Sequence, residues 1–262
     1  MCQLLAMNSF KPARLDFSLA GFLRRGGETG EHADGWGAAF FGEEGCRHII
    51  DEQASARSPL AQAVQQQAVS ACNIIVHIRK ATRGAVTSEN CHPFVRKLWG
   101  REWAFAHNGT LEQVDASATG HFRAVGQTDS ELAFCSLLNA LREEFGEQAP
   151  ELQAQIDCLD AVSAKLARHG SFNFVMSNGE TLFARRATEL SYVQRAYPFG
   201  CARLLDCAMN IDFARHNHLD DRMVIVATAP LTDEAWQPLP QGEVIAFQRG
   251  MAHTASPMQF AV

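Results

Sequence analysis

Short apolar runs broken by Gly, Asn or Pro recur along most of the chain, and they predict β-strands. β-Branched and aromatic residues are frequent within them, as is usual for strands. The pattern is clearest in seven ranges: 36–41, 73–79, 103–108, 172–177, 181–186, 223–228 and 243–248.

Apolar residues at helical spacing predict four helices. The most distinct begins at TDSE (128–131) and runs to about Phe145, with Thr128 and Glu131 in the positions of a capping box. Its apolar stripe consists of Leu132, Leu137, Leu138, Leu141 and Phe145. Three further ranges also have helical spacing: 16–25, 58–67 and the stretch between Pro150 and Gly170.

The order of these elements is strands, then two consecutive helices, then strands. A doubly wound parallel sheet would instead alternate strand and helix along the chain. The observed order suits antiparallel sheets with helices packed on their outer faces. No repeat, low-complexity tract or Pro/Ser-rich linker divides the sequence, so we expect a single domain over residues 1–262.

Composition narrows the class of protein. The 262 residues are 47% hydrophobic with a formal net charge of −6, and no Lys/Arg run appears. We therefore expect neither nucleic acid nor a membrane as a partner. No apolar stretch approaches the roughly 20 residues of a membrane span, and the N-terminus lacks the pattern of a signal peptide. These features predict a cytoplasmic protein.

The eight cysteines form no C-x-x-C pair and no zinc-type spacing. In a reducing compartment most of them should be buried free thiols. A zinc hydrolase using His216 and His218, or Cys91 and His92, lacks a convincing ligand set, so we expect no metal and no cofactor.

Several short segments contain residue types that catalysis uses, and each also has an ordinary structural explanation. Arg79 ends an apolar strand, where it is either simply exposed or grips a carboxylate through two hydrogen bonds. Asn108-Gly109 is typical of a two-residue hairpin turn, yet an amide side chain beside a glycine N–H can also form an oxyanion hole. Asp129 either stabilises a helix N-terminus or has a role in a site. The glycine-rich stretch RRGGETGEHADGWG (24–37) lacks the phosphate-binding spacings, so by itself it suggests a mobile surface loop.

These segments occur together in one order, and the chain resembles the class II glutamine amidotransferases over essentially its whole length. The segments that carry the resemblance are Cys2, HADGWG (32–37), HIRKAT (77–82), HNG (107–109) and TDSE (128–131). The likeness is greatest to small stand-alone bacterial members of the YafJ type. They share the stretches RGGxTGxHxDGWG, ENxHPF and AHNGxL and a similar helix after TDSE.

The resemblance implies an α+β fold of the N-terminal-nucleophile hydrolase kind, a four-layer αββα sandwich of two antiparallel sheets. It also implies that removal of Met1 makes Cys2 the N-terminal nucleophile, with its own α-amine as general base. Asn108 and Gly109 would then hold the oxyanion, Arg79 the substrate α-carboxylate and Asp129 its α-ammonium. Thr82 lies in the segment that closes over glutamine in the family.

The resulting hypothesis is hydrolysis of the side-chain amide of glutamine or of a small γ-glutamyl conjugate. Two alternatives remain open: a subunit that donates ammonia to a separate synthase, and a catalytically silent relative that binds amino acids or regulates. Retention of Cys2, Asn108 and Gly109 argues against silence, because a binding protein needs neither a nucleophile nor an oxyanion hole. Similarity to the family also makes a homodimer plausible.

Overall fold

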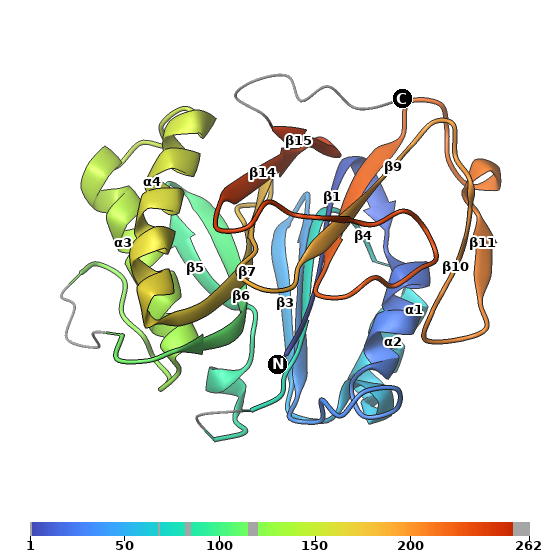
Figure 1. Cartoon of the computed structure of the whole chain (residues 1–262), viewed down its shortest axis with the longest axis horizontal. Helices are drawn as coiled ribbons and strands as arrows, with labels where there is room; N and C mark the ends of the chain where they lie inside the picture. The colour runs from blue at the N-terminus through green and yellow to red at the C-terminus, as the bar shows by residue number, and fades with distance from the viewer. Residues whose placement is uncertain (1, 68, 82–84, 115–119, 254–262) are drawn as a thin grey trace.

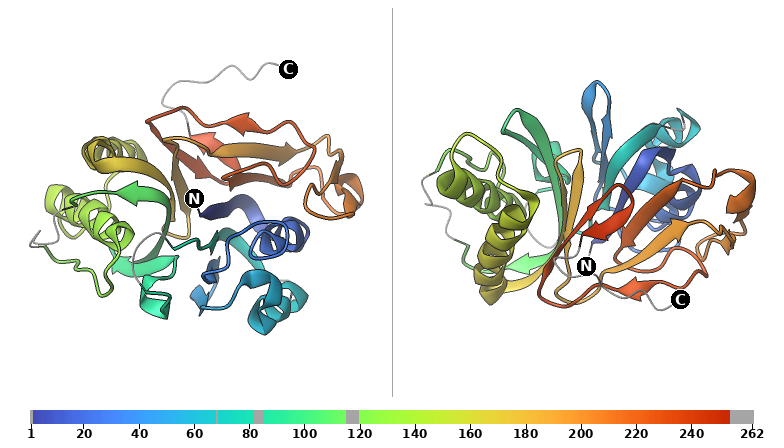
Figure 2. Two further views of the ribbon diagram at one scale, coloured as in Figure 1. Left: turned by 60° about the horizontal axis from the view of Figure 1, so that its bottom comes forward. Right: turned by 90° about the horizontal axis from the view of Figure 1, so that it is seen from above.

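Two antiparallel β-sheets lie face to face in the computed structural model, with a pair of helices on each outer side (Figure 1). The structure describes residues 2–67, 69–81, 85–114 and 120–253. The further views in Figure 2 agree that the two pairs of helices lie on opposite sides of the sheets. The layers therefore follow the order helix, sheet, sheet, helix, and the expected αββα sandwich is confirmed.

Within the described ranges the first sheet has seven strands, and β1 lies at its centre. β1 pairs with β12 on one side and with β4 on the other. In spatial order the strands are β13 (Gln237–Pro238), β9 (Ser191–Ala196), β12 (Arg222–Ala227), β1 (Gln3–Arg14), β4 (Ser70–Ile78), β2 (Trp36–Gly42) and β3 (Gly45–Asp51).

The second sheet has six strands, and β6 and β7 form its longest pairing. Its spatial order is β15 (Met251–His253), β14 (Val244–Gln248), β8 (Thr181–Arg185), β7 (Gly170–Ser177), β6 (Arg101–Leu111) and β5 (Phe94–Leu98). A separate small hairpin joins β10 (Cys201–Arg203) to β11 (Asn210–Asp212).

The helices cover the outer faces of the sheets. α1 (Asp16–Arg24) and α2 (Pro59–Gln67) pack on the first sheet, and α3 (Asp129–Phe145) and α4 (Leu152–Leu166) pack on the second. Four short 3₁₀ turns complete the described elements: η1 (Ser55–Arg57), η2 (Ser88–Asn90), η3 (Ala167–His169) and η4 (Phe213–Arg215).

Side chains alternate along each strand between the face that contacts the helices and the face that contacts the other sheet. On β1, Leu5 and Met7 face the helices, whereas Leu4 and Ala6 face the other sheet. Many of the side chains that meet between the sheets are small, among them Ala6, Ala39, Ala104, Ala106 and Ala184. The alternation therefore decides which residues can lie between the sheets.

All seven predicted strands and all four predicted helices are present, with ends that differ by a few residues. The central strand β1 is the main element that the apolar pattern did not reveal. The expectation that most cysteines are buried is wrong: all eight are free, but only Cys91, Cys135 and Cys158 are buried.

The start of α3 differs in detail from the predicted capping box. The Thr128 hydroxyl does accept the Glu131 N–H, at 3.2 Å. The Glu131 carboxylate, however, accepts the N–H groups of Val125 and Gly126 and pairs with Arg96. It therefore holds the loop before the helix, because a buried carboxylate requires a cation and N–H donors.

The apolar stripe of α3 is centred on a residue that the predicted stripe omitted. Phe134 is fully buried and stacks on Phe105 of β6 with ring centroids 5.1 Å apart, whereas Leu132 and Phe145 are only partly buried.

Phe134→Ala is expected to lower the free energy of unfolding by about 3–5 kcal/mol, because it opens a cavity between α3 and the second sheet. Phe145→Ala is the matched control and should cost clearly less, because that ring is already partly exposed. Urea denaturation of both variants measures the difference. Equal losses would show that Phe134 does not anchor the helix.

Candidate active site

Cys2 lies directly before β1, beside the end of β4. Its thiol donates to the carbonyl of Lys80 at 3.4 Å and accepts the Lys80 N–H at 3.3 Å. Burial raises the pKa of the Cys2 thiol above its usual value, although the Lys80 N–H opposes this effect. The thiol is therefore neutral at rest, and a nucleophilic role requires a base to remove its proton.

Asn108 and Gly109 lie inside strand β6 and not in a turn. Asn108 pairs with Asn173 and Gly109 with Phe172 of β7, so the interpretation of Asn-Gly as a hairpin turn is wrong. A Cβ atom on Gly109 would come 1.9 Å from the Ser171 carbonyl oxygen, which excludes any larger residue here. The backbone of Asn108 is fixed in turn, because its carbonyl accepts the Asn173 side-chain amide at 2.9 Å.

The Asn108 side chain points between the sheets and is completely buried. It continues the face of β6 that carries Ala104 and Ala106. Its Nδ2 donates to the hydroxyl of Thr228 at 3.3 Å, and that hydroxyl also accepts the N–H of Leu4 at 2.9 Å. Thr228 thus connects the predicted oxyanion residue to the strand that carries Cys2.

Arg79 follows β4 immediately and is buried. Its guanidinium donates to the Ala85 carbonyl at 2.9 Å. The same carbonyl accepts the Asn90 side-chain amide at 3.2 Å, and the Asn90 Oδ1 accepts the Gln127 N–H at 3.1 Å. Asn90 therefore joins the segment that contacts Arg79 to the segment that leads into Asp129. Thr82 lies outside the described residues.

Asp129 is the first residue of α3, and its carboxylate accepts the N–H of Leu111 at the end of β6, at 2.6 Å. The next residue, Ser130, contacts His107 Nδ1 at 2.8 Å, and His107 Nε2 lies 3.0 Å from the Ser171 carbonyl. Since a carbonyl can only accept, Nε2 carries the proton and Nδ1 accepts from the serine hydroxyl. The first turn of α3 is thereby fixed to β6 and β7 on both sides of Asn108.

Three buried histidines lie close to these residues. His77 Nε2 and His92 Nδ1 are 3.1 Å apart, and their rings pack edge to face. Burial lowers the pKa of His77 to about 3, that of His92 well below its usual value, and that of His107 in the same direction. All three rings are therefore neutral at neutral pH.

The glycine-rich stretch is anchored by Arg25, which argues against the surface-loop interpretation for this part of it. Arg25 is buried and pairs with Asp206. Its guanidinium also donates to Gln3 Oε1 at 3.3 Å and to the carbonyls of Ala229 and Pro230 at 3.0 and 2.6 Å. Arg25 thus fixes the residue after Cys2 to the segment after Thr228.

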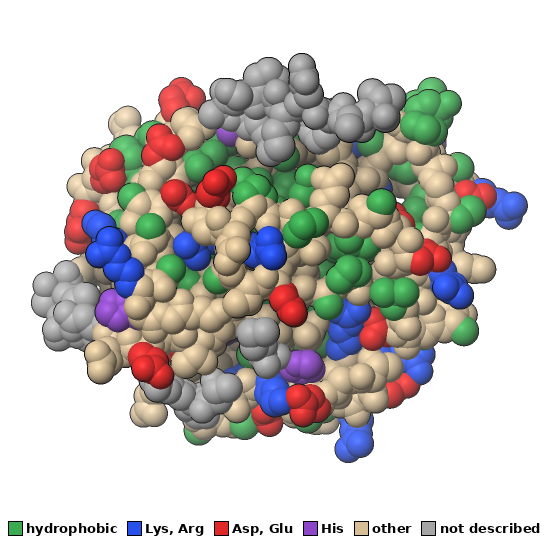
Figure 3. All heavy atoms as spheres, viewed as in Figure 1, with side chains coloured by type: hydrophobic (Ala, Val, Ile, Leu, Met, Phe, Trp, Pro, Cys, Tyr) green, Lys and Arg blue, Asp and Glu red, His purple; other side chains and the backbone are tan. Residues whose placement is uncertain are grey.

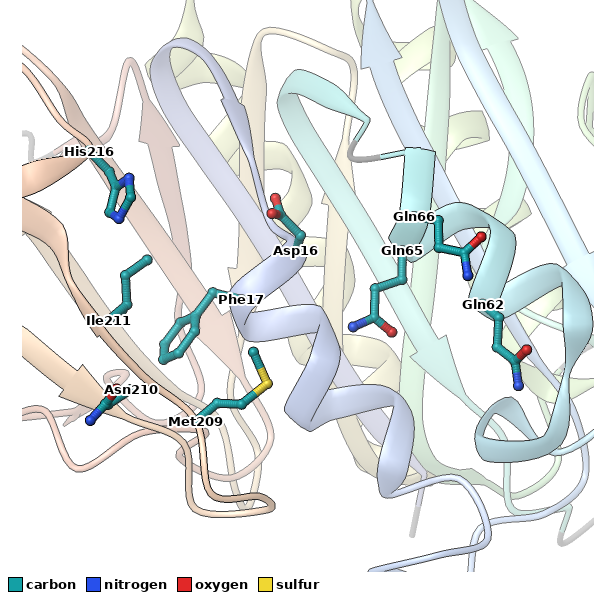
Figure 4. Close-up of a pocket in the computed structure, with 9 residues that line it drawn as sticks. All are labelled: Asp16, Phe17, Gln62, Gln65, Gln66, Met209, Asn210, Ile211 and His216. Atoms are coloured by element: carbon teal, nitrogen blue, oxygen red, sulfur yellow. The ribbon is translucent and has the colours of Figure 1, made fainter.

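The structure also has a cavity away from these residues. It measures about 650 Å³ and lies between the two helices of the first sheet and the β11 segment (Figure 4). Its lining residues are Asp16, Phe17, Gln62, Gln65, Gln66, Met209, Asn210, Ile211 and His216. None of them is a predicted site residue, apart from His216 in the zinc alternative.

On the face shown in Figure 3, acidic side chains are frequent at the upper left, and acidic and basic side chains are intermixed at the lower right. Among the described residues, no group of three or more His, Cys, Asp or Glu side chains is placed to hold a metal ion. Within that same part of the chain, no helix is long and apolar enough to cross a membrane.

The family model described as "Glutamine amidotransferases class-II" matches residues 1–261. The chain belongs to the class II glutamine amidotransferases. Among curated relatives of this chain is the Escherichia coli (strain K12) protein named "Putative glutamine amidotransferase YafJ", which is 42% identical over 244 residues. The match covers 93% of this chain and 96% of YafJ. A Haemophilus influenzae protein with a similar name is 43% identical, covering 95% of this chain and 85% of that protein.

Solved structures agree with the family assignment. A crystal structure described as a predicted glutamine amidotransferase from Pseudomonas aeruginosa PA01 superposes with a TM-score of 0.75 at 35% identity, covering 97% of this chain and 100% of that one. The glutamine phosphoribosylpyrophosphate amidotransferase of Bacillus subtilis has a TM-score of 0.59 at 14% identity, covering 98% of this chain and 50% of that one. At that identity the likeness concerns the fold alone, which is the expected N-terminal-nucleophile fold.

The structure adds residues that the sequence analysis missed. Thr228, Asn90 and Ser171 contact the predicted site residues or fix them, but they come from distant parts of the chain. Asn90 lies in the ENxHPF stretch and Thr228 is the last residue of the predicted strand 223–228, but neither pattern indicates these contacts. Nothing in the sequence near Thr228 indicated its contact with Asn108.

The buried histidines predict how stability depends on pH. A histidine whose folded pKa is lowered stays neutral while the unfolded chain takes up a proton below about pH 6.5. The free energy of unfolding should therefore fall as the pH decreases from 6.5, and for His77 this continues towards its folded pKa of about 3. His77 alone contributes a slope of up to about 1.4 kcal/mol per pH unit in that window, and His92 and His107 act in the same direction.

Urea denaturation between pH 4.5 and 7.5 measures this slope. His77→Gln is expected to reduce this slope by the contribution of one histidine, up to about 1.4 kcal/mol per pH unit. The substitution also lowers the free energy of unfolding at pH 7. His216→Gln, at an exposed position, is the control for the substitution itself. An identical slope for wild type and His77→Gln would contradict the assignment.

Proposed function

We propose that this chain hydrolyses the side-chain amide of glutamine, or of a small γ-glutamyl conjugate, through a γ-glutamyl thioester on Cys2. The observation that carries the proposal is the connection from the Cys2 strand through Thr228 to Asn108, with Gly109 next to it. A nucleophile and a pair of oxyanion donors held by one network suit acyl transfer better than simple binding.

The proposed reaction begins with removal of Met1, which gives Cys2 a free α-amine. Such amines titrate near pH 7.7–8.0, close enough to neutral pH to take the proton of a thiol. The raised pKa of the thiol makes this base necessary. The thiolate then attacks the amide carbon, and negative charge develops on the oxygen, facing Asn108 Nδ2–H and Gly109 N–H.

The α-ammonium next returns the proton to the leaving nitrogen, and ammonia or an amine departs from the tetrahedral intermediate. A water molecule, deprotonated by the same amine, attacks the thioester carbonyl. Glutamate leaves when the thiol is reprotonated, so atoms and protons balance over the cycle. Arg79 and Asp129 would bind the α-carboxylate and α-ammonium of the substrate. Asn90 supports this pairing, because its side chain contacts the Ala85 carbonyl that Arg79 also contacts, and it accepts the N–H of Gln127, two residues before Asp129.

Active protein is expected to begin at Cys2 and to form a thioester that hydroxylamine converts to γ-glutamyl hydroxamate. Intact-mass analysis reports the N-terminus, and hydroxamate and ammonia assays with glutamine and γ-glutamyl amides report turnover. Cys2→Ala should abolish both products with little change in melting temperature. Cys201→Ala, which removes an exposed thiol, is the control and should remain active.

Two results would contradict this mechanism. Turnover by protein that fully retains Met1 would exclude the α-amine as base. Wild-type protein that begins at Cys2, binds glutamine and releases no product would support the silent relative.

Arg79→Lys and Asp129→Asn are expected to raise KM about 10- to 100-fold with a smaller loss in kcat, since hydrogen bonds to charged groups contribute about 1.5–3 kcal/mol. Lysine cannot replace the two parallel hydrogen bonds of a guanidinium. The Asp129→Asn side chain would still offer an oxygen to the Leu111 N–H, so this variant keeps the helix contact and removes the charge.

A glutamine analogue without the α-amine separates recognition from helix capping at Asp129. Wild type should discriminate strongly against the analogue, and Asp129→Asn should do so much less. Equal discrimination by both proteins would mean that Asp129 serves the helix alone.

A further inference from the structure

Thr228 occupies an unusual position at the end of β12. Its N–H donates to the Leu4 carbonyl at 3.0 Å, as in a regular antiparallel pair. The return bond from Leu4 N–H goes to the Thr228 hydroxyl, at 2.9 Å, and not to the backbone carbonyl. The side chain thus takes the place of the main chain in the last pair of the ladder, two residues from Cys2.

The same hydroxyl forms a hydrogen bond with the side-chain amide of Asn108, which lies on the other sheet. It accepts Asn108 Nδ2–H at 3.3 Å, so both acceptor positions of the oxygen are used. Within the described part of the chain, the buried Asn108 Oδ1 has no hydrogen-bond partner. No other side-chain hydrogen bond of this amide is seen among the described residues, so Thr228 determines how the amide is turned.

The geometry has a direct consequence for the oxyanion donors. A primary amide has two N–H bonds in one plane, and fixing one of them to Thr228 fixes the direction of the other. Thr228 is itself held by β1, which carries Cys2. The position of the second N–H is therefore set relative to the nucleophile through a single oxygen atom, although the two strands belong to different sheets.

We propose that Thr228 is a positioning residue, whose hydroxyl aligns the Asn108 amide with the Cys2 strand so that one N–H is directed at the developing oxyanion. This inference rests on the proposed amide hydrolysis. It assigns Thr228 no contact with substrate: the residue acts through Asn108. A misdirected oxyanion donor weakens binding of the transition state and leaves binding of the substrate largely unchanged.

The test is a double-mutant cycle in steady-state kinetics, using Thr228→Val, Asn108→Ala and the double variant. Valine keeps the shape of threonine and removes the hydroxyl. Thr228→Val is expected to lower kcat about tenfold with KM within about twofold. In the Asn108→Ala background it should lower kcat by less than about twofold further, because the residue through which it acts is gone.

Two further variants separate positioning from general stability. Thr228→Ser retains the hydroxyl and should recover most of the lost kcat. Thr181→Val removes a buried threonine hydroxyl elsewhere, one that accepts from Gln248 at 2.7 Å, and should keep the wild-type kcat. Alkylation of Cys2 by iodoacetamide, a displacement that forms no oxyanion, should proceed at the wild-type rate in Thr228→Val.

Three results would each overturn the proposal. The first is an unchanged kcat in Thr228→Val, and the second is additive losses of kcat in the double-mutant cycle. The third is a parallel fall of kcat and of the rate of Cys2 alkylation in Thr228→Val. The side-chain amide signal of Asn108 in protein labelled with ¹⁵N-asparagine gives a readout without turnover. Thr228→Val should shift this signal, and Thr181→Val should not. If wild type shows no turnover while the signal shifts as expected, the proposed function fails and the alignment by Thr228 stands; an unshifted signal refutes the alignment itself.

Discussion

The packing of one sheet directly on the other is the interaction on which the rest of the structure depends. Alanines and larger apolar side chains fill this layer together, and polar side chains continue the same faces towards one end. Cys2, Arg79, Asn108 and Thr228 have the same parity along their strands as the apolar residues Leu4, Ile75, Ala106 and Val226. Since the period is two, a slip of one residue in any of these strands would turn its candidate side chain towards a helix.

The same alternation explains which strands were visible in the sequence. Strands in the second half of the chain stand out because Gly, Asn or Pro bounds them and because aromatic and β-branched residues are dense within them. β1 did not stand out, because both its faces are buried near its start, where LLAM (4–7) is a continuous apolar run without alternation. Its second half contains Lys11 and Pro12, which are unusual in a central strand.

The order of motifs was enough to propose the candidate residues, because each lies in a short segment that can be read locally. Their supporting contacts could not be predicted in the same way. Thr228 is 120 residues from Asn108 along the chain, and only the folded sheets bring them together. At Asn108-Gly109 the local sequence is misleading. The dipeptide is typical of a turn, but both residues pair with β7 inside a strand. Local sequence predicts helices and strands, whereas tertiary packing decides which of their side chains come into contact.

The position of β12 next to β1 has a consequence for the order in which the protein can assemble. During synthesis the strand that follows Cys2 emerges first, but its neighbour on one side ends at Ala227. Until most of the chain has left the ribosome, β1 has an unpaired edge, and the Leu4 N–H and the Asn108 amide lack their shared acceptor. If Met1 is removed during synthesis, as the proposed mechanism requires, the enzyme that removes it would act before the sheet is complete. The topology of the chain would then separate that step in time from completion of the candidate site.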